Sequence, residues 1–450
     1  MTDHAHGQSP AYSTRHDCRS CRSTALTAVL SMGEQALSMF LPPDAPPAPR
    51  APLDLVLCDG CGLLQLRHTA APELLYREYW YRSGVNQTMR DHLAGITRAA
   101  EAAVELRAGD VVLDIGCNDG TLLRSYRTPG LDRIGFEPAR NLLAEAREGT
   151  TQVINELFAR EPYVAALGDR PARIVTSIAM FYDLDEPNRF VTDVQRILAP
   201  DGVWVIEMNY LRSMLDQNAF DNICHEHVTY YSLRSLEQLL QRHGLEVFDI
   251  ELHPINGGSF RAYVQHPAVR AVSERVSALR ATEAHLTEWS TYERFAERVR
   301  AVRAQLSEFI RCETARGKSV YVYGASTRGN TLLQYFGLDH TLITAAAERN
   351  PAKYGLRTPG TGIPIVSEQQ ARDARPDYFL VLPWAFLDEF QQREHEFLAR
   401  GGRLIVPLPA PRLIGADGEQ RPLHESSAVR PAREHAEDRD AVEAAAGGEQ

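Results

Sequence analysis

Four cysteines near the N-terminus fall into two Cys-x-x-Cys pairs, Cys18 with Cys21 and Cys58 with Cys61. Each pair forms a tight turn that presents two sulfurs to one ion, and two such pairs match a tetrahedral zinc site. Because four sulfurs leave no open position on the metal, we expect a structural zinc ion. The alternatives are a redox pair, or small core residues that bind no metal.

A glycine turn, Asp114-x-Gly116-x-x-x-Gly120, is the second pattern that indicates chemistry. Glycines let the backbone approach a ligand closely, and the helix that follows begins with exposed N–H groups. The turn is wider than the Gly-x-Gly-x-x-Gly turn of dinucleotide-binding folds. It suits S-adenosylmethionine, whose amino and carboxylate groups need Asp114 and backbone partners.

An acidic residue at the end of the next predicted strand strengthens this interpretation. Glu137 follows the glycine turn by about 20 residues, where an acid binds the ribose hydroxyls in nucleoside-binding α/β folds. The two features together predict a site for S-adenosylmethionine. Its expected contacts are Asp114, Gly116, Cys117, Asn118, Gly120, Glu137, Pro138, Asn155 and Ser177.

The segment Cys224-His225-Glu226-His227 places two histidines on either side of a carboxylate. Their spacing differs from the His-Glu-x-x-His zinc motif of a helix, so the segment favours acid–base chemistry over metal binding. Histidine suits proton transfer near neutral pH. An exposed polar loop without chemistry is the alternative.

Two further glycine turns are less specific. Gly257–Ser259 precedes an apolar run and indicates a close backbone approach or a bulge, for which a purely structural role fits equally well. Gly324–Asn330 lies between a predicted strand and a predicted helix, a place that favours an anion. Because Ser326 stands where a dinucleotide fingerprint has its second glycine, this turn supports NAD only weakly.

Apolar runs alternate with helix-like stretches around these motifs, which implies parallel sheets with helices on both faces. The predicted strands are Val111–Ile115, Arg133–Glu137, Ile174–Ile178, Val203–Met208, Glu246–Ile250 and Phe260–Gln265, and later Ser319–Tyr323, Leu342–Ala346, Tyr378–Leu382 and Arg403–Val406.

The chain is therefore expected to be an α/β protein of several parts. Residues 18–70 form a small zinc-binding module with an exposed loop at Pro42–Pro49. Residues 71–271 form a Rossmann-like methyltransferase domain, and residues 317–414 a second Rossmann-like α/β domain. Residues 1–17 are expected to be flexible, and residues 415–450 a disordered tail.

A helical connection is predicted over residues 272–316. Its apolar side chains recur at three- and four-residue steps, as on a packing face of a helix. They are Tyr292, Phe295, Val299, Val302, Leu306 and Phe309.

Composition excludes some classes of function. The 450 residues carry a formal net charge of −11, which argues against broad nucleic-acid binding. No run of 18 apolar residues predicts a membrane span, and no secretion signal is recognisable at the start. We expect a cytoplasmic protein, where paired cysteines usually bind metal or do redox work.

With these motifs the chain resembles the bacterial sugar C-methyltransferases that act on nucleotide-linked 4-keto-deoxysugars. The resemblance runs from about Cys18 to Pro409. Its segments are Cys18–Cys21, Cys58–Leu66, Tyr79–Gly84, Leu113–Gly116, His225–Ser232, Gly257–Arg261 and Tyr323–Asn330.

The resemblance implies carbon methylation in deoxysugar or antibiotic biosynthesis. In that family a base removes the proton on the carbon beside a ketone, and the enolate attacks the activated methyl group. It implies His227 as the leading base, Glu226 and His225 as orienting groups, and Asp183 as a further participant. The implied substrate contacts are Tyr79, Tyr81, Ser83, Cys224, Gly258, Ser259 and Arg261.

Two positions depart from the family pattern. Asp183 stands where the family often has a histidine, and Cys224 where it often has a tyrosine. A carboxylate needs burial to act as a base at pH 7, and a thiol is a weaker donor than a phenol. The alternatives are a non-sugar carbonyl acceptor, a binding protein that has lost turnover, or an oxidoreductase that uses the second glycine turn.

Overall fold

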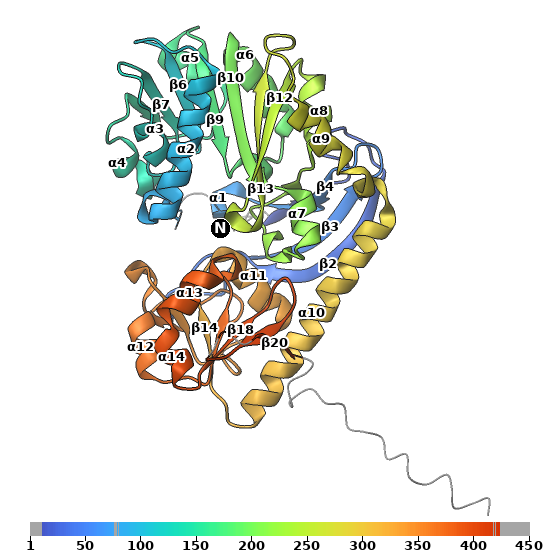
Figure 1. The fold of residues 1–450 in the computed structure, drawn as a ribbon, viewed down its shortest axis with the longest axis vertical. Coiled ribbons are helices and arrows are strands. Elements are labelled where there is room, and N and C mark those ends of the chain that lie inside the picture. The colour runs from blue at the N-terminus through green and yellow to red at the C-terminus, as the bar shows by residue number, and fades with distance from the viewer. Residues whose placement is uncertain (1–10, 76–78, 80, 417, 419, 424–450) are drawn as a thin grey trace, which may run out of the picture.

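The computed structural model describes residues 11–75, 79, 81–416, 418 and 420–423. Two α/β lobes lie one above the other, with an N-terminal β-hairpin between them and the long helix α10 along one side (Figure 1). The predicted α/β class, with two Rossmann-like parts and an N-terminal module, is confirmed.

The central lobe is built on a seven-stranded sheet of order β12-β13-β10-β9-β6-β7-β8. Its strands are β6 (Val111–Ile115), β7 (Asp132–Phe136), β8 (Gln152–Ile154), β9 (Ala172–Ile178), β10 (Leu198–Asn209), β12 (Glu246–His253) and β13 (Ser259–Gln265). Strands β6 to β10 run parallel, and β13 runs antiparallel between β10 and β12. Every residue of β6 is buried, as expected for a parallel strand covered on both faces.

All six strands predicted for this lobe are present, whereas β8 escaped prediction because only three residues form it. The helices of this part of the chain are α1 (Pro72–Leu75), α2 (Gln87–Ala103), α3 (Thr121–Arg124), α4 (Leu143–Ala146), α5 (Arg160–Leu167), α6 (Pro187–Ile197), α7 (Leu211–Asp216) and α8 (Leu233–Arg242).

The N-terminal module contains two small sheets. Strand β1 (Tyr12–Thr14) pairs with β5 (His68–Ala70), and a four-stranded sheet has the order β11-β4-β3-β2. The strands of the second sheet are β2 (Leu26–Ala36), β3 (Arg50–Cys58), β4 (Leu64–Leu66) and β11 (Thr229–Tyr230). The edge strand of this sheet, β11, therefore comes from the chain segment of the central lobe.

The far end of the β2–β3 hairpin reaches the C-terminal lobe (Figure 1). Leu41 forms a bridge with Arg357, and the side chain of Gln334 accepts the N–H of Ala36 at 2.7 Å. The proline-rich loop between the two strands is mostly exposed, as predicted.

The connection between the lobes is two helices rather than one stretch. Helix α9 (Glu274–Ala281) is followed by a 3₁₀ turn (Ala284–Thr287) and by α10 (Trp289–Ala315). The six apolar side chains predicted to pack on one face are all buried. They join one core cluster with residues of the hairpin, α7 and the C-terminal lobe, so α10 binds all three parts together.

The C-terminal lobe has a second seven-stranded sheet, of order β16-β15-β14-β17-β18-β19-β20. Its strands are β14 (Val320–Tyr323), β15 (Ala346–Glu348), β16 (Ile365–Ser367), β17 (Tyr378–Val381), β18 (Arg403–Val406), β19 (Arg412–Ile414) and β20 (Gln420–Pro422). The helices are α11 (Thr327–Phe336), α12 (Glu368–Asp373), α13 (Leu387–Arg393) and α14 (His395–Ala399).

Three predictions need correction. The strand predicted at Leu342–Ala346 begins only at Ala346, because Leu342 and Ile343 lie in a turn whose N–H groups donate to Asp339. Residues 12–14 form β1 rather than a flexible end; residues 1–10 lie outside the described part. Residues 420–422 form β20 on the edge of the sheet rather than a loose tail, while 424–450 also lie outside.

None of the helices in the described part of the chain combines the length and the apolar character that a membrane crossing requires.

Candidate active site

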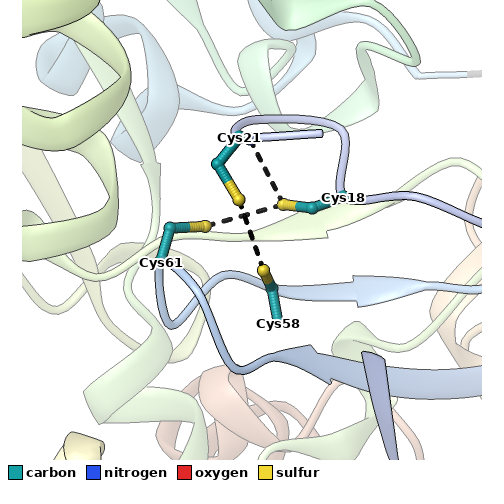
Figure 2. A group of neighbouring side chains, drawn as sticks. All are labelled: Cys18, Cys21, Cys58 and Cys61. Atoms are coloured by element: carbon teal, nitrogen blue, oxygen red, sulfur yellow. Dashed lines mark hydrogen bonds between the residues drawn. The ribbon is translucent and has the colours of Figure 1, made fainter. Parts of the chain in front are cut away.

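The four cysteines of the N-terminal module converge on one point (Figure 2). The sulfurs of Cys18 and Cys61 are 3.5 Å apart, those of Cys21 and Cys58 3.4 Å, and all four lie within 4.8 Å of one another. A tetrahedral zinc ion with Zn–S bonds of about 2.3 Å places its sulfurs about 3.8 Å apart. The spacing fits that ion and is far too long for disulfide bonds.

Two backbone turns bring these sulfurs together. Arg22 and Gly62 have left-handed φ angles of 63° and 73°, and their N–H groups donate to the carbonyls of Cys18 and Cys58. Each turn curls its cysteine pair toward the same point. The donor set and its geometry support the predicted structural zinc.

The predicted cofactor turn lies at the carboxyl end of β6, where parallel α/β sheets bind ligands. Gly116, Asn118 and Gly120 all have left-handed φ angles, of 76°, 52° and 77°. At Gly120 an added Cβ would lie 2.9 Å from the carbonyl oxygen of Ala146, so only glycine fits. The turn therefore presents backbone instead of side chains.

Glu137 follows β7 and faces the same space. Its two carboxylate oxygens accept the N–H groups of Asn118 and Ala139, both at 2.8 Å. Burial raises the pKa of Glu137 to about 7, while these two hydrogen bonds oppose the rise. Each oxygen retains a lone pair for a ribose hydroxyl, so the fit to an adenosyl group is good.

Asp114 is buried beneath the glycine turn. Its carboxylate accepts the hydroxyl of Thr176 at 2.6 Å. Burial raises its pKa to about 7, and the nearby charge of Glu137 adds to the rise. Both acids of the cofactor site therefore change protonation near neutral pH.

The segment that the resemblance assigned to the substrate is fastened to the cofactor turn. The side chain of Asn118 accepts the N–H of Ser83 and donates to the carbonyl of Tyr81, both at 3.0 Å. The backbone of Tyr79 exchanges two hydrogen bonds with the side chain of Asn141. All three residues of this segment, Tyr79, Tyr81 and Ser83, line the same cavity as the cofactor turn.

This cavity has a volume of about 690 Å³ and is walled by all three parts of the chain. The N-terminal module contributes Phe40 and Thr69, and the C-terminal lobe contributes Arg328, Lys353 and Trp384. The cavity thus runs from the cofactor turn to the facing lobe.

Two carboxylates, Asp183 and Glu226, lie in the wall beyond the cofactor turn. Burial raises the pKa of Asp183 well above its ordinary value, and the charge of Glu226 raises it further. One oxygen of Asp183 is buried and has no hydrogen-bond partner among the described residues. Burial also raises the pKa of Glu226 to about 7.

His227 lies in the same wall, with its ring 4.3 Å from that of Tyr182 between centroids. Its Nδ1–H donates to the carbonyl of Asn222 at 2.9 Å, which leaves Nε2 without a proton. Burial and the charge of Arg328 lower the pKa of His227 to about 3. The imidazole is therefore neutral and weakly basic.

His225 also lines the cavity, but its ring is hydrogen-bonded to the N-terminal module. Its Nε2–H donates to the carbonyl of Ala51 in β3 at 2.9 Å, and burial lowers its pKa to about 4. Its neighbour Cys224 lies in the cavity wall, and burial raises the pKa of its thiol well above the ordinary value. His225 thus fixes the loop to β3, and both residues line the cavity.

Some predicted contacts do not line the cavity. An added Cβ on Gly258 would lie 2.6 Å from that of Ser213, and Ser259 donates to the carbonyl of Ile255. Asn155 donates to the carbonyls of Glu137 and Pro138, so it positions the cofactor acid instead of touching the cavity. The full set outside the cavity wall is Gly120, Asn155, Ser177, Gly258, Ser259 and Arg261.

Arg261 acts through a neighbour that sequence reasoning missed. Its Nε donates to Glu207 at 2.8 Å, and Glu207 also contacts the Nε2 of His92. Glu207 and His92 both line the cavity. The position of Glu207 at the carboxyl end of β10 was the signal available, because ligands gather at that edge.

A second missed group joins the two lobes. The carboxylate of Asp221 accepts Arg328 at 2.5 Å and the indole N–H of Trp384 at 3.2 Å. All three residues line the cavity. Asp221 precedes the His225 segment by four residues, whereas Arg328 and Trp384 are over a hundred residues further on, so no local pattern linked them.

We expect Cys58→Ser to lose the zinc and to unfold at a lower temperature, because three sulfurs hold the ion less tightly and its binding stabilises the fold. Metal analysis and thermal unfolding measure both effects. Cys312→Ser, at a thiol on α10, is the control and should keep one zinc per chain. Full zinc content and unchanged melting in Cys58→Ser would contradict the site.

We expect affinity for S-adenosylmethionine to fall as the pH drops below about 7, because the ionised form of Glu137 accepts the ribose hydroxyls and its pKa is about 7. Glu137→Gln should weaken binding about 10- to 100-fold at pH 8. Calorimetric titration between pH 6 and 8 measures this. Glu101→Gln, at a carboxylate that also accepts backbone N–H groups but lies outside the cavity wall, is the control.

Comparisons with known proteins agree with this layout. Family models match residues 18–76 (a zinc binding domain), 82–250 (a methyltransferase domain) and 254–409 (the C-methyltransferase C-terminal domain). The C-methyltransferase NovU of Streptomyces niveus is 35% identical over 410 residues, which cover 89% of this chain and 97% of NovU.

Two solved structures resemble the chain in part. One is a chain of the complex between the Haloferax volcanii Trm112 methyltransferase activator and a methyltransferase (19% identity, 40% of this chain and 93% of that chain, TM-score 0.33). The other is the Mycobacterium tuberculosis cyclopropane synthase MmaA2 (13% identity, 43% and 90%, TM-score 0.32). With three family models in order along its length and a relative that it covers almost completely, this chain belongs to the C-methyltransferase family and is an S-adenosylmethionine-dependent, zinc-binding methyltransferase.

Proposed function

We propose that the enzyme methylates the carbon beside the ketone of a nucleotide-linked keto-deoxysugar. One observation carries this: a cluster of partly buried acid–base groups shares a single cavity with the cofactor turn. Carbon becomes nucleophilic only after it loses a proton, and that loss needs a base held close to it.

Asp183 is the base in this proposal. It lines the cavity, one of its oxygens has no partner among the described residues, and its raised pKa makes it a stronger base than an ordinary carboxylate. Burial is the main cause of that raised pKa, and the charge of Glu226 adds to it. His227 has too low a pKa to take the proton at neutral pH, so we assign it to orienting the substrate through its bare Nε2.

Tyr182 supplies the hydrogen bond that the developing enolate oxygen needs. Its phenol lines the cavity beside His227, and burial holds its pKa well above the ordinary value, so it stays protonated. A phenol is a stronger donor than the thiol of Cys224. S-adenosylmethionine, when bound, supplies the electrophilic methyl group and leaves as S-adenosylhomocysteine.

The far wall of the cavity supports a substrate that carries negative charge. Arg328 and Lys353 of the C-terminal lobe both line it, each in an ion pair with one carboxylate, Asp221 at 2.5 Å and Glu348 at 3.3 Å. Tyr79, Tyr81 and Ser83 line the side next to the cofactor turn. A diphosphate-linked sugar combines the ketone with such an anion. We place the enzyme in the cytoplasm, where a reducing environment keeps the four zinc ligands as thiols.

Methyl-labelled S-adenosylmethionine and a panel of nucleoside diphosphate 4-keto-6-deoxyhexoses test the proposal. We expect the label on the carbon next to the ketone, located by NMR. Simple β-keto esters form the comparison arm, and methylation of these alone would contradict the sugar assignment. Label found only on oxygen or nitrogen would contradict carbon methylation altogether.

The carboxylate pair predicts how the rate depends on pH. The base must be ionised, and burial together with the charge of Glu226 raises the pKa of Asp183 well above its ordinary value, so the rate of methylation should rise with pH well above the range in which an ordinary carboxyl group ionises. Asp183→Asn should slow exchange of the substrate α-proton into D₂O about 10²- to 10⁴-fold. Glu226→Gln removes the charge that raises the pKa of Asp183, so the acidic limb should move to lower pH while exchange persists.

Tyr182→Phe keeps the ring but loses the donor, and should lower the rate about 10²- to 10³-fold. The control is Asp193→Asn, at a buried acid outside the cavity wall, which should leave exchange unchanged. Normal exchange in Asp183→Asn would show that another group is the base.

A further inference from the structure

The zinc loop carries a fully buried arginine between its first two ligands. Arg19 has no exposed surface, and it is one of the largest side chains buried in the protein. Its Nη1 donates to the side chain of Gln65 at 3.2 Å and to the carbonyl of Leu66, while its Nη2 donates to the hydroxyl of Thr69 at 2.6 Å. These contacts fix the guanidinium to the strands of the module.

The Nε–H of Arg19 makes a contact outside the module, with the turn that carries Asp183. Its Nε donates to the carboxylate of Asp185 at 3.1 Å, and the hydroxyl of Thr69 donates to the same oxygen at 2.6 Å. Arg15 contacts the other oxygen of Asp185 at 3.2 Å. Asp185 lies two residues after Asp183, in the turn that precedes α6.

Hydrogen bonds donated from α6 to the zinc loop also hold the Asp183 turn and this loop together. Asn188, in the first turn of α6, donates to the carbonyls of Arg19 and Ser20 at 2.8 and 2.9 Å. The turn that carries Asp183 is thus tied to the zinc loop on both sides. A buried charge held by this many hydrogen bonds keeps its partner in one place.

The other arm of the reaction site is tied to the same module. Strand β11 begins two residues after His227 and pairs with β4, and the carbonyl of Tyr182 accepts the N–H of Val228 at 3.0 Å and the hydroxyl of Thr229 at 3.0 Å. The ring of His225 is bound to Ala51 of β3. Both carboxylate-bearing segments therefore rest on one zinc-bound support.

We propose that the zinc-binding module is a positioning part of the reaction site, and that Arg19 is the positioning residue which holds the Asp183 turn against the Glu226 loop. The inference rests on the proposed roles of Asp183 and Glu226. In this proposal Arg19 sets the distance between the carboxylates of Asp183 and Glu226. Both the removal of the substrate proton and the pKa of Asp183 depend on that distance.

Arg19→Lys tests this directly. Lysine keeps the charge but cannot donate from a planar fork to Asp185, Gln65 and Thr69 at once. We expect kcat to fall about 10- to 100-fold, as for other groups that orient catalytic residues. Affinity for S-adenosylmethionine and the content of one zinc per chain should stay unchanged, and amide hydrogen exchange in residues 180–188 should become faster.

Arg22→Lys is the matched control. Arg22 lies in the same zinc loop and pairs with Asp17 and Glu186, but it is exposed, so its ion pairs contribute little. Its kcat and its exchange in residues 180–188 should match the wild type. Thr69→Val, which removes the hydroxyl bridging Arg19 and Asp185, gives an independent test should Arg19→Lys not fold; it should change kcat and exchange in the same direction.

A folded, zinc-loaded Arg19→Lys with wild-type kcat and exchange would overturn the inference. Loss of zinc from this variant would also overturn it, because Arg19 would then serve the metal site. These measurements separate a failure of the inference from a failure of the proposed function. If the acceptor is not a keto-sugar, amide hydrogen exchange and zinc content still test the contact between the zinc loop and the Asp183 turn. Faster exchange at 180–188 with an unaltered pH profile would reject the assignment of Asp183 as base and leave the link standing.

Discussion

The cost of burying carboxylates around one cavity is the constraint on which the rest of the structure depends. Asp114, Glu137, Asp183 and Glu226 all line it, and burial raises the pKa of each. An acid in such surroundings is unfavourable unless the backbone supplies donors or the acid keeps its proton. The cofactor end uses backbone donors, as at Glu137, whereas one oxygen of Asp183 at the reaction end has no hydrogen-bond partner in the part of the chain that the structure describes. That difference separates a binding acid from an acid suited to proton transfer.

The scaffold around these acids is made by segments distant in sequence. The glycine turn and the turn before α6 follow strands of the central sheet, the His225 loop leads into the N-terminal module, and Arg328 and Trp384 come from the facing lobe. Arg261 and Asn155 hold cavity residues in place without lining the cavity themselves. Arg261 and Arg328 thus each hold one acid of the cavity wall in place, Glu207 and Asp221.

Features that depend on neighbouring residues could be predicted from the sequence, whereas contacts between distant segments could not. The zinc ligands, Asp114, Gly116 and Glu137 were recognisable because each belongs to a short pattern with a local physical reason, and the strands of the central sheet because their apolar runs are long. Gly258 and Arg261 match a motif of the family, but Gly258 lies against Ser213 and Arg261 binds Glu207, so neither lines the cavity and the match in sequence did not reveal this. Asp221, Arg328 and Trp384 meet only through the packing of two lobes, and no spacing along the chain encodes that contact.

The edge strand β11 has a consequence for how the protein is made. Leu64 and Gln65 leave the ribosome more than 160 residues before their partners Tyr230 and Thr229. Leu41 likewise leaves it more than 300 residues before its partner Arg357. The cysteine cluster, by contrast, is complete once Cys61 has emerged. Zinc can therefore organise a local nucleus early in synthesis, while the sheet built on it stays open until most of the chain exists. Contacts of such long sequence separation form slowly, and an open strand edge invites wrong pairing. Early metal binding would then protect the nascent chain as well as support the finished enzyme.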